Sequence, residues 1–129
     1  MVSRGLADTS LFIARESGRQ IAADRLPDDL AVSVITIGEL RAGVLAATDT
    51  TTRDRRLATL IAAQMIDPVP IDEPAAEAWG RLRVSLRDLG RRMPVNDSWI
   101  AATAIALGVP VVTQDADYVD VPGLDVLTV

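Results

Sequence analysis

The stretch Gly5-Leu6-Ala7-Asp8-Thr9-Ser10-Leu11-Phe12-Ile13 joins a short apolar strand to the start of a helix through one acidic residue. A similar order returns further along the chain. Residues 30–35 are apolar and β-branched, and apolar residues at helical spacing follow them from Thr36. Residues 109–113 form another apolar run of strand type, followed by Gln114 and Asp115. This alternation predicts an α/β fold in which helices cover both faces of a mostly parallel sheet.

The remaining segments complete this pattern. Residues 66–71 carry Pro68 and Pro70, which places a short strand at a sheet edge, because proline cannot donate a ladder hydrogen bond. A final strand is expected at residues 124–129. Helices are expected at residues 11–17, 19–26, 36–47, 53–65, 73–89 and 96–107. No repeat or linker interrupts the chain, and we expect residues 1–129 to form a single domain.

The composition leaves few side chains that can do chemistry. The chain has 129 residues, 49% of them hydrophobic but only 3% aromatic, so its core must be aliphatic. It contains no histidine or cysteine, and all 13 basic residues are arginines. These absences exclude thiol nucleophiles, cysteine-ligated zinc and the lysine of a phosphate-binding P-loop. Carboxylates remain, and gathered carboxylates suit Mg²⁺ or Mn²⁺.

The N-terminus has no apolar run of signal-peptide length before Asp8, and the longest nearly apolar stretch, residues 100–112, is too short for a membrane-spanning helix. These features predict a soluble, cytoplasmic protein. The net charge of −5 argues weakly against a nucleic-acid partner. The arginines do cluster, in residues 53–56 and 81–92, but exposed helix faces with pairs such as Glu77 and Arg81 explain that clustering equally well.

Acidic residues occur at the strand–helix junctions. Parallel α/β sheets bind ligands at the carboxyl ends of their strands. Asp8 follows a strand directly, Asp115 lies two residues past another strand, and Glu39 lies in the first turn of a helix that follows a strand. Asp97 begins a helix that leads into a strand, so connectivity alone does not bring it to this edge. Asp117 is a fifth candidate, two residues beyond Asp115.

Each acid also has a purely structural explanation. Asp8 is a suitable N-cap, and Thr36 to Glu39 has the spacing of a capping box. Asp97 suits the positive end of a helix dipole, and Asp115 an ordinary turn. Helix capping alone, however, gives no reason for acids to recur so regularly at these junctions.

Four segments in order carry a more specific signal. They are Asp8-Thr9-Ser10-Leu11-Phe12-Ile13, Ile37-Gly38-Glu39-Leu40-Arg41-Ala42-Gly43, Asn96-Asp97-Ser98-Trp99-Ile100-Ala101-Ala102-Thr103-Ala104 and Val112-Thr113-Gln114-Asp115-Ala116-Asp117-Tyr118. Together they resemble the PIN domain family, in particular the VapC-type toxins of bacterial toxin–antitoxin pairs. The resemblance spans Leu6 to about Leu124. It implies a three-layer α/β/α fold around a parallel sheet of about five strands.

The resemblance also implies the site and its activity, an endoribonuclease that depends on Mg²⁺ or Mn²⁺, with one or two ions bound. Its catalytic acids would be Asp8, Glu39, Asp97 and Asp115. Asp8, Asp97 and Asp115 would ligate metal, with Asp117 as an auxiliary ligand or a sharer of the role of Asp115. Ser10 and Thr113 would be polar supports that orient the carboxylates.

The chemistry follows from the side chains that are present. Without histidine or lysine, the chain lacks the usual acid–base pair for attack by the RNA 2′-hydroxyl. We therefore predict hydrolysis that leaves a 5′-phosphate and a 3′-hydroxyl. Arg41, Arg91 and Arg92 could hold backbone phosphates, although exposed ion pairs would explain each of them as well.

The toxin resemblance also implies partners. They would be an antitoxin whose tail covers the acidic site, and a second copy of the chain in a homodimer, with residues 40–45 and 57–65 as candidate contact surfaces. Two rival hypotheses remain at this stage. One is a catalytically weak PIN-like module that binds RNA or protein, which the complete set of four acids disfavours. The other is a structural α/β domain with well-capped helices.

Overall fold

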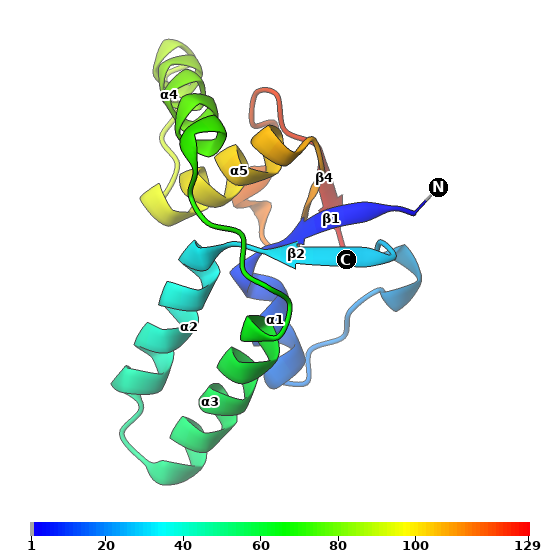
Figure 1. The fold of residues 1–129 in the computed structure, drawn as a ribbon, viewed down its shortest axis with the longest axis vertical. Helices are drawn as coiled ribbons and strands as arrows, with labels where there is room; N and C mark the ends of the chain where they lie inside the picture. Colours follow the sequence, from blue (N-terminus) through cyan, green and yellow to red (C-terminus); the bar gives the residue numbers. More distant parts are fainter. Residues whose placement is uncertain (1) are drawn as a thin grey trace.

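A parallel sheet forms the centre of the molecule in the computed structural model, which describes residues 2–129 (Figure 1). Its four strands are β1 (Arg4–Ala7), β2 (Asp29–Val32), β3 (Val111–Thr113) and β4 (Val126–Thr128), in the spatial order β2-β1-β3-β4. All three strand pairs are parallel. The predicted α/β class is therefore confirmed.

The proline-bearing segment 66–71 lies beside β2, at the edge of the sheet. It makes one parallel bridge, between Val69 and Ser33, in which the Val69 amide donates to Val32 O at 2.7 Å. The predicted edge position is correct. Pro68 and Pro70 have no N–H groups, which accounts for a single bridge in place of a full strand.

Five helices cover the sheet: α1 (Thr9–Glu16), α2 (Val34–Ala46), α3 (Thr50–Gln64), α4 (Glu73–Asp88) and α5 (Val95–Leu107). Figure 1 shows α2 and α3 side by side, with α4 and α5 paired on the other side of the sheet. Short 3₁₀ turns lie at Ala23–Arg25 and Ala116–Tyr118. None of the helices described in residues 2–129 is long and apolar enough to cross a membrane.

Alternate strand residues separate the two halves of the core. Leu6 and Val111 belong to the cluster that includes Ile100 of α5, whereas Ala7 and Val112 pack with Leu11 of α1. This is the two-residue period of a strand buried on both faces.

Gly5 allows the closest approach within the sheet. A Cβ atom at this position would lie 2.6 Å from Val112 Cγ2. A larger residue at position 5 would therefore force β1 and β3 apart. The carboxyl ends of these two strands are where Asp8 and Asp115 follow.

Three local expectations were wrong. Residues 19–26 form only the short 3₁₀ turn. The second strand ends at Val32, and Ser33 caps α2 by accepting a hydrogen bond from the Ile35 amide at 3.0 Å, so Thr36 is not the cap. α5 begins at Val95 after Pro94 rather than at Asn96 or Asp97, because proline fixes the entry geometry without a side-chain cap.

Candidate active site

Asp8 is the anchor of the site. It follows β1 directly, is only 2% exposed, and caps α1. Its Oδ2 atom accepts hydrogen bonds from Thr113 Oγ1 at 2.9 Å and from the Ser10 amide at 3.3 Å. Its Oδ1 atom accepts from the Tyr118 hydroxyl at 2.8 Å. Three donors thus hold one buried carboxylate in a fixed orientation.

A chain of hydroxyl groups supports Asp8 from behind. Because Thr113 gives its only hydroxyl proton to Asp8, Ser10 Oγ, 3.1 Å away, must donate to Thr113. Ser10 Oγ in turn accepts from the Gln114 amide at 3.1 Å, and Thr113 Oγ1 accepts from the Asp115 amide at 2.9 Å. These bonds tie the start of α1 to the end of β3 and place the backbone of Asp115 in the same network.

Tyr118 joins Asp97 to this network. Its hydroxyl lies 2.8 Å from Asp8 Oδ1 and 3.3 Å from Asp97 Oδ1, and its side chain is completely buried. Asp97 is in the first turn of α5, whose buried face packs on β1 and β3. This packing brings Asp97 to Asp8, which the order of elements along the chain did not predict.

The electrostatics show how closely the aspartates are gathered. Burial, followed by the negative charges of Asp8 and Asp117, raises the pKa of Asp97 to about 7. The same influences raise the pKa of Asp115, against an opposing effect of Arg19. Burial and the neighbouring carboxylates also raise the pKa of the Tyr118 hydroxyl, so it remains a donor. The four aspartates therefore form one interacting group with little positive charge to balance it.

Glu39 lies on α2 and is held by hydroxyl groups other than those that hold Asp8. Its Oε1 accepts from Thr9 Oγ1 at 2.8 Å, and Thr9 Oγ1 lies 2.9 Å from Thr36 Oγ1. Because Thr9 donates to Glu39, Thr36 donates to Thr9. Glu39 thus does not bond back to the Thr36 amide as a capping box would require. Among residues 2–129, no hydrogen bond joins Glu39 directly to Asp8.

The donor set suits a hard divalent cation, since it consists of carboxylate and hydroxyl oxygens. In the described residues, no group of three or more acidic side chains is arranged closely enough to hold a metal ion as it stands. The Tyr118 hydroxyl lies between Asp8 and Asp97 and separates two of the candidate ligands. A metal would therefore require small shifts of these side chains from their present positions.

The three candidate arginines differ in their surroundings. Arg91 donates to the carbonyl oxygens of Asp120 and Val119, at 2.6 and 3.0 Å. Its guanidinium is therefore largely committed to holding the 119–120 segment. Arg92 lines a hollow between α4 and the start of α5. Arg41 is exposed on α2, and no hydrogen bond or ion pair within residues 2–129 links it to the aspartates.

Tyr118 and Thr9 are site residues that the sequence reasoning missed. Tyr118 is the only tyrosine in the chain and follows Asp115 and Asp117 just beyond a strand, which was an available signal. Thr9 adjoins Asp8, but its contact with Glu39 joins residues 30 positions apart and becomes visible only in the fold.

Comparison with known proteins identifies the family. Residues 6–124 match the PIN domain family. The chain belongs to this family. This PIN domain is similar to Ribonuclease VapC5 of Mycobacterium tuberculosis, with 49% identity over 119 residues that cover 92% of this chain and 88% of VapC5. It is also similar to Ribonuclease VapC4 of the same species, with 48% identity over 129 residues, or 99% of this chain and 98% of VapC4.

A solved structure shows the same fold. The VapBC-5 member of the VapBC toxin–antitoxin systems, from Mycobacterium tuberculosis, aligns with this PIN domain at a TM-score of 0.90 and 42% sequence identity. The alignment covers 98% of this chain and 99% of the other. The resemblance to the PIN domain family that the four sequence segments indicated is therefore confirmed.

Proposed function

We propose that this PIN domain is a metal-dependent endoribonuclease that acts in the cytoplasm as the toxin of a toxin–antitoxin pair and inhibits translation and growth by cutting RNA. The observation that carries the proposal is the buried Asp8 carboxylate, which is held by three donors and shares the Tyr118 hydroxyl with Asp97. Its relatives Ribonuclease VapC5 and Ribonuclease VapC4, at 48–49% identity, support the same activity.

Asp8, Asp97 and Asp115 would hold Mg²⁺, or Mn²⁺ in its place, with Asp117 as an auxiliary ligand. One or two ions would suit this number of carboxylates. When bound, the metal supplies charge stabilisation at the phosphate and lowers the pKa of a bound water. Asp115 is favoured over Asp117 as the principal fourth acid, because its amide is bonded to Thr113, which holds Asp8.

The protein's own groups would orient the reaction. Ser10, Thr113 and Tyr118 fix the Asp8 carboxylate, so that it need not reorganise during the reaction. Glu39, held by Thr9, would be the acid that orients a water molecule from the α2 side. The products would be a 5′-phosphate and a 3′-hydroxyl. Arg92 and Arg41 are proposed to contact phosphates, and Arg91 to shape the site through the 119–120 segment.

A cognate antitoxin is the proposed protein partner, because the similar structure is described as a toxin–antitoxin system. Exposed apolar side chains on α2 and at the end of α3 provide a surface for this partner or for a second copy of the chain. Leu45 is 75% exposed and Met65 81% exposed, whereas Leu40, Val44 and Leu60 are buried between the helices.

The test is cleavage of end-labelled RNA by the purified chain in Mg²⁺, in Mn²⁺ and in EDTA, with the Asp97→Asn variant alongside. We expect metal-dependent cuts whose 3′-fragments accept no further phosphate from a kinase until they are dephosphorylated. Equal cleavage by the variant, or cleavage in EDTA, would contradict the mechanism. RNA binding without any cleavage would indicate a binding module instead.

A further inference from the structure

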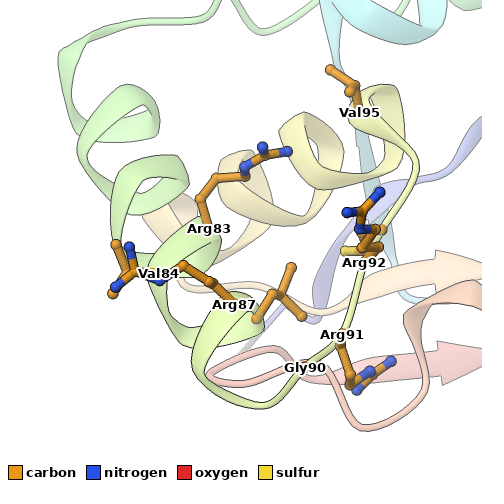
Figure 2. A pocket seen from close by; sticks show the side chains of 9 residues that line it. Arg83, Val84, Arg87, Gly90, Arg91, Arg92 and Val95 are labelled. Carbon is orange, nitrogen blue, oxygen red and sulfur yellow. The ribbon is translucent and has the colours of Figure 1, made fainter.

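A hollow of about 880 Å³ lies between the C-terminal half of α4 and the loop that leads into α5. Its lining includes four arginines, Arg83, Arg87, Arg91 and Arg92, and no acidic residue (Figure 2). We call this hollow the arginine pocket. Val95, the first residue of α5, closes one side of it, two positions before Asp97. The pocket therefore adjoins the helix turn that carries a site aspartate.

The four arginines are not equally available to a ligand. Arg91 is bonded to backbone carbonyls, and Arg87 lies 3.5 Å from Asp88 in an exposed pair. Arg83 and Arg92 have no acidic partner among residues 2–129. In Figure 2, the Arg83 side chain extends from α4 toward α5 and that of Arg92 extends toward Val95, while Arg91 turns away. The guanidinium groups of Arg83 and Arg92 are thus available to bind an anion, although the chain as a whole has a net charge of −5.

An aromatic stack holds Arg83 in place. The Arg83 guanidinium carbon lies 5.1 Å from the centre of the Trp79 ring. Trp79 is stacked on Trp99, with ring centres 4.4 Å apart and planes within 4°, and its Nε1 donates to Ser98 Oγ at 3.0 Å. Arginine held against an aromatic face is partly ordered before a ligand arrives, which lowers the entropy cost of binding.

We infer that the arginine pocket binds the phosphate backbone of single-stranded RNA, with Arg83 and Arg92 as its two ligand-contacting cations. The inference rests on the proposed ribonuclease function and assigns it a substrate subsite. A strand that enters the acidic site meets the negative charge of the four aspartates, and cations beside α5 would offset that repulsion. The planar guanidinium group of arginine can donate two parallel hydrogen bonds to phosphate oxygens. Contacts of this kind hold a strand in place without depending on its base sequence.

The test measures binding separately from cleavage. In an Asp97→Asn background, which blocks cutting, the dissociation constant of a fluorescent single-stranded RNA is measured across a range of salt concentrations. Arg83→Gln and Arg92→Gln should each weaken binding by about tenfold and reduce the salt slope by about 0.7 for each lost phosphate contact. Arg81→Gln is the matched control, because Arg81 lies on the same helix and carries the same charge but pairs with Glu77 at 3.0 Å.

The aromatic stack provides a second readout. Trp79 and Trp99 are the only tryptophans in the chain, so RNA bound at Arg83 should change the intrinsic fluorescence. Trp79→Leu should weaken RNA binding severalfold, and adding Arg83→Gln to this variant should weaken it little further. Trp79→Phe should retain most of the affinity. If Arg83→Gln and Arg92→Gln bind RNA as Arg81→Gln does, the inference is overturned.

Two further outcomes separate this inference from the proposed function. If the wild type never cuts RNA but binds it through Arg83 and Arg92, the pocket assignment stands and the ribonuclease proposal fails. If the wild type cuts RNA and its affinity is insensitive to both arginines, the pocket assignment fails alone. A glutamate-rich peptide can be added as a competitor at the same concentration of negative charges as the RNA. If it displaces the RNA, the pocket recognises negative charge in general, and the assignment to RNA is overturned.

Discussion

The acidic edge, made of Asp8, Asp97, Asp115 and Asp117, and the arginine pocket both adjoin the first turn of α5, and each gathers charges of one sign. They differ in how the charges are held. At the acidic edge, hydroxyl and amide donors fix a carboxylate that is only 2% exposed, and burial together with the neighbouring negative charges raises the pKa of Asp97 to about 7. In the pocket, an aromatic face and backbone carbonyls position exposed guanidinium groups.

The difference separates two tasks. Charges of one sign gathered around a buried carboxylate are costly, and a bound counter-ion would relieve that cost, which agrees with the proposed role of the acidic edge in holding a metal and cutting RNA. Exposed arginines cost little to maintain and attract a polyanion through a salt-dependent field. Substitutions at the edge should therefore change the rate of cleavage, while substitutions in the pocket should change affinity.

The largest effect is expected at Asp8. Asp8→Asn keeps the shape but removes the charge that three donors hold, and should reduce cleavage by roughly 10³-fold or more, because groups that act as a unit fail together. Asp115→Asn should lose more activity than Asp117→Asn, since only the Asp115 amide bonds to Thr113. Initial rates at saturating Mg²⁺ measure both. An Asp117→Asn defect larger than that of Asp115→Asn would reverse their order.

A smaller effect on the same edge is expected from Tyr118→Phe. The ring stays in the core, but the donor shared by Asp8 and Asp97 is lost, and loss of an orienting partner of this kind costs about 10–100-fold in metal affinity or activity. The Mg²⁺ concentration needed for half-maximal cleavage should rise, while RNA affinity stays unchanged. A melting temperature close to that of the wild type confirms that the fold is intact. Unchanged metal dependence would show that the hydroxyl is dispensable.

The strand beneath the acidic edge offers a test by packing alone. Gly5→Ala places a methyl group 2.6 Å from Val112 Cγ2 and should reduce the free energy of unfolding by about 1–3 kcal/mol. Gly38→Ala is the matched control, because nothing lies within 4 Å of its added Cβ on the exposed face of α2. It should stabilise the protein by up to about 1 kcal/mol. Urea unfolding of both variants measures the difference, and equal values would contradict the packing.

The smallest expected effect is the pH dependence of the metal-free protein. The folded-state pKa of Asp97 is about 7, above its ordinary value of 3.8, so the fold binds this proton more tightly than the unfolded chain does. The stabilisation is complete below about pH 4 and is lost as pH rises to 7 and beyond. In EDTA, Asp97→Asn should melt about 4 °C higher than wild type at pH 8, with a smaller difference at pH 5 and nearly none at pH 4. A difference independent of pH would contradict the pKa assignment.

The sequence predicted the positions of the candidate acids wherever the chain order alone determines them. Asp8 and Asp115 follow parallel strands, so their place at one edge required only the fold class. The position of Asp97 could not be predicted without the packing of α5 on the sheet. The role of Tyr118 depends on the turn Ala116–Tyr118, which brings its hydroxyl to Asp8 and Asp97. The start of α2 was misplaced because Ser33 and Thr36 are both competent caps, and the choice depends on where β2 stops pairing. The Trp79–Trp99 stack joins two helices and leaves no local sequence signal.

Single-turnover cleavage of one RNA at increasing protein concentration tests the separation of tasks most directly, because the plateau rate and the half-saturation concentration are read from the same curve. We predict that Asp97→Asn lowers the plateau rate by at least about 10²-fold with little change in half-saturation. Arg83→Gln should retain the plateau rate and shift half-saturation about tenfold higher. Loss of plateau rate in Arg83→Gln, or a matching shift in half-saturation for Asp97→Asn, would contradict this separation.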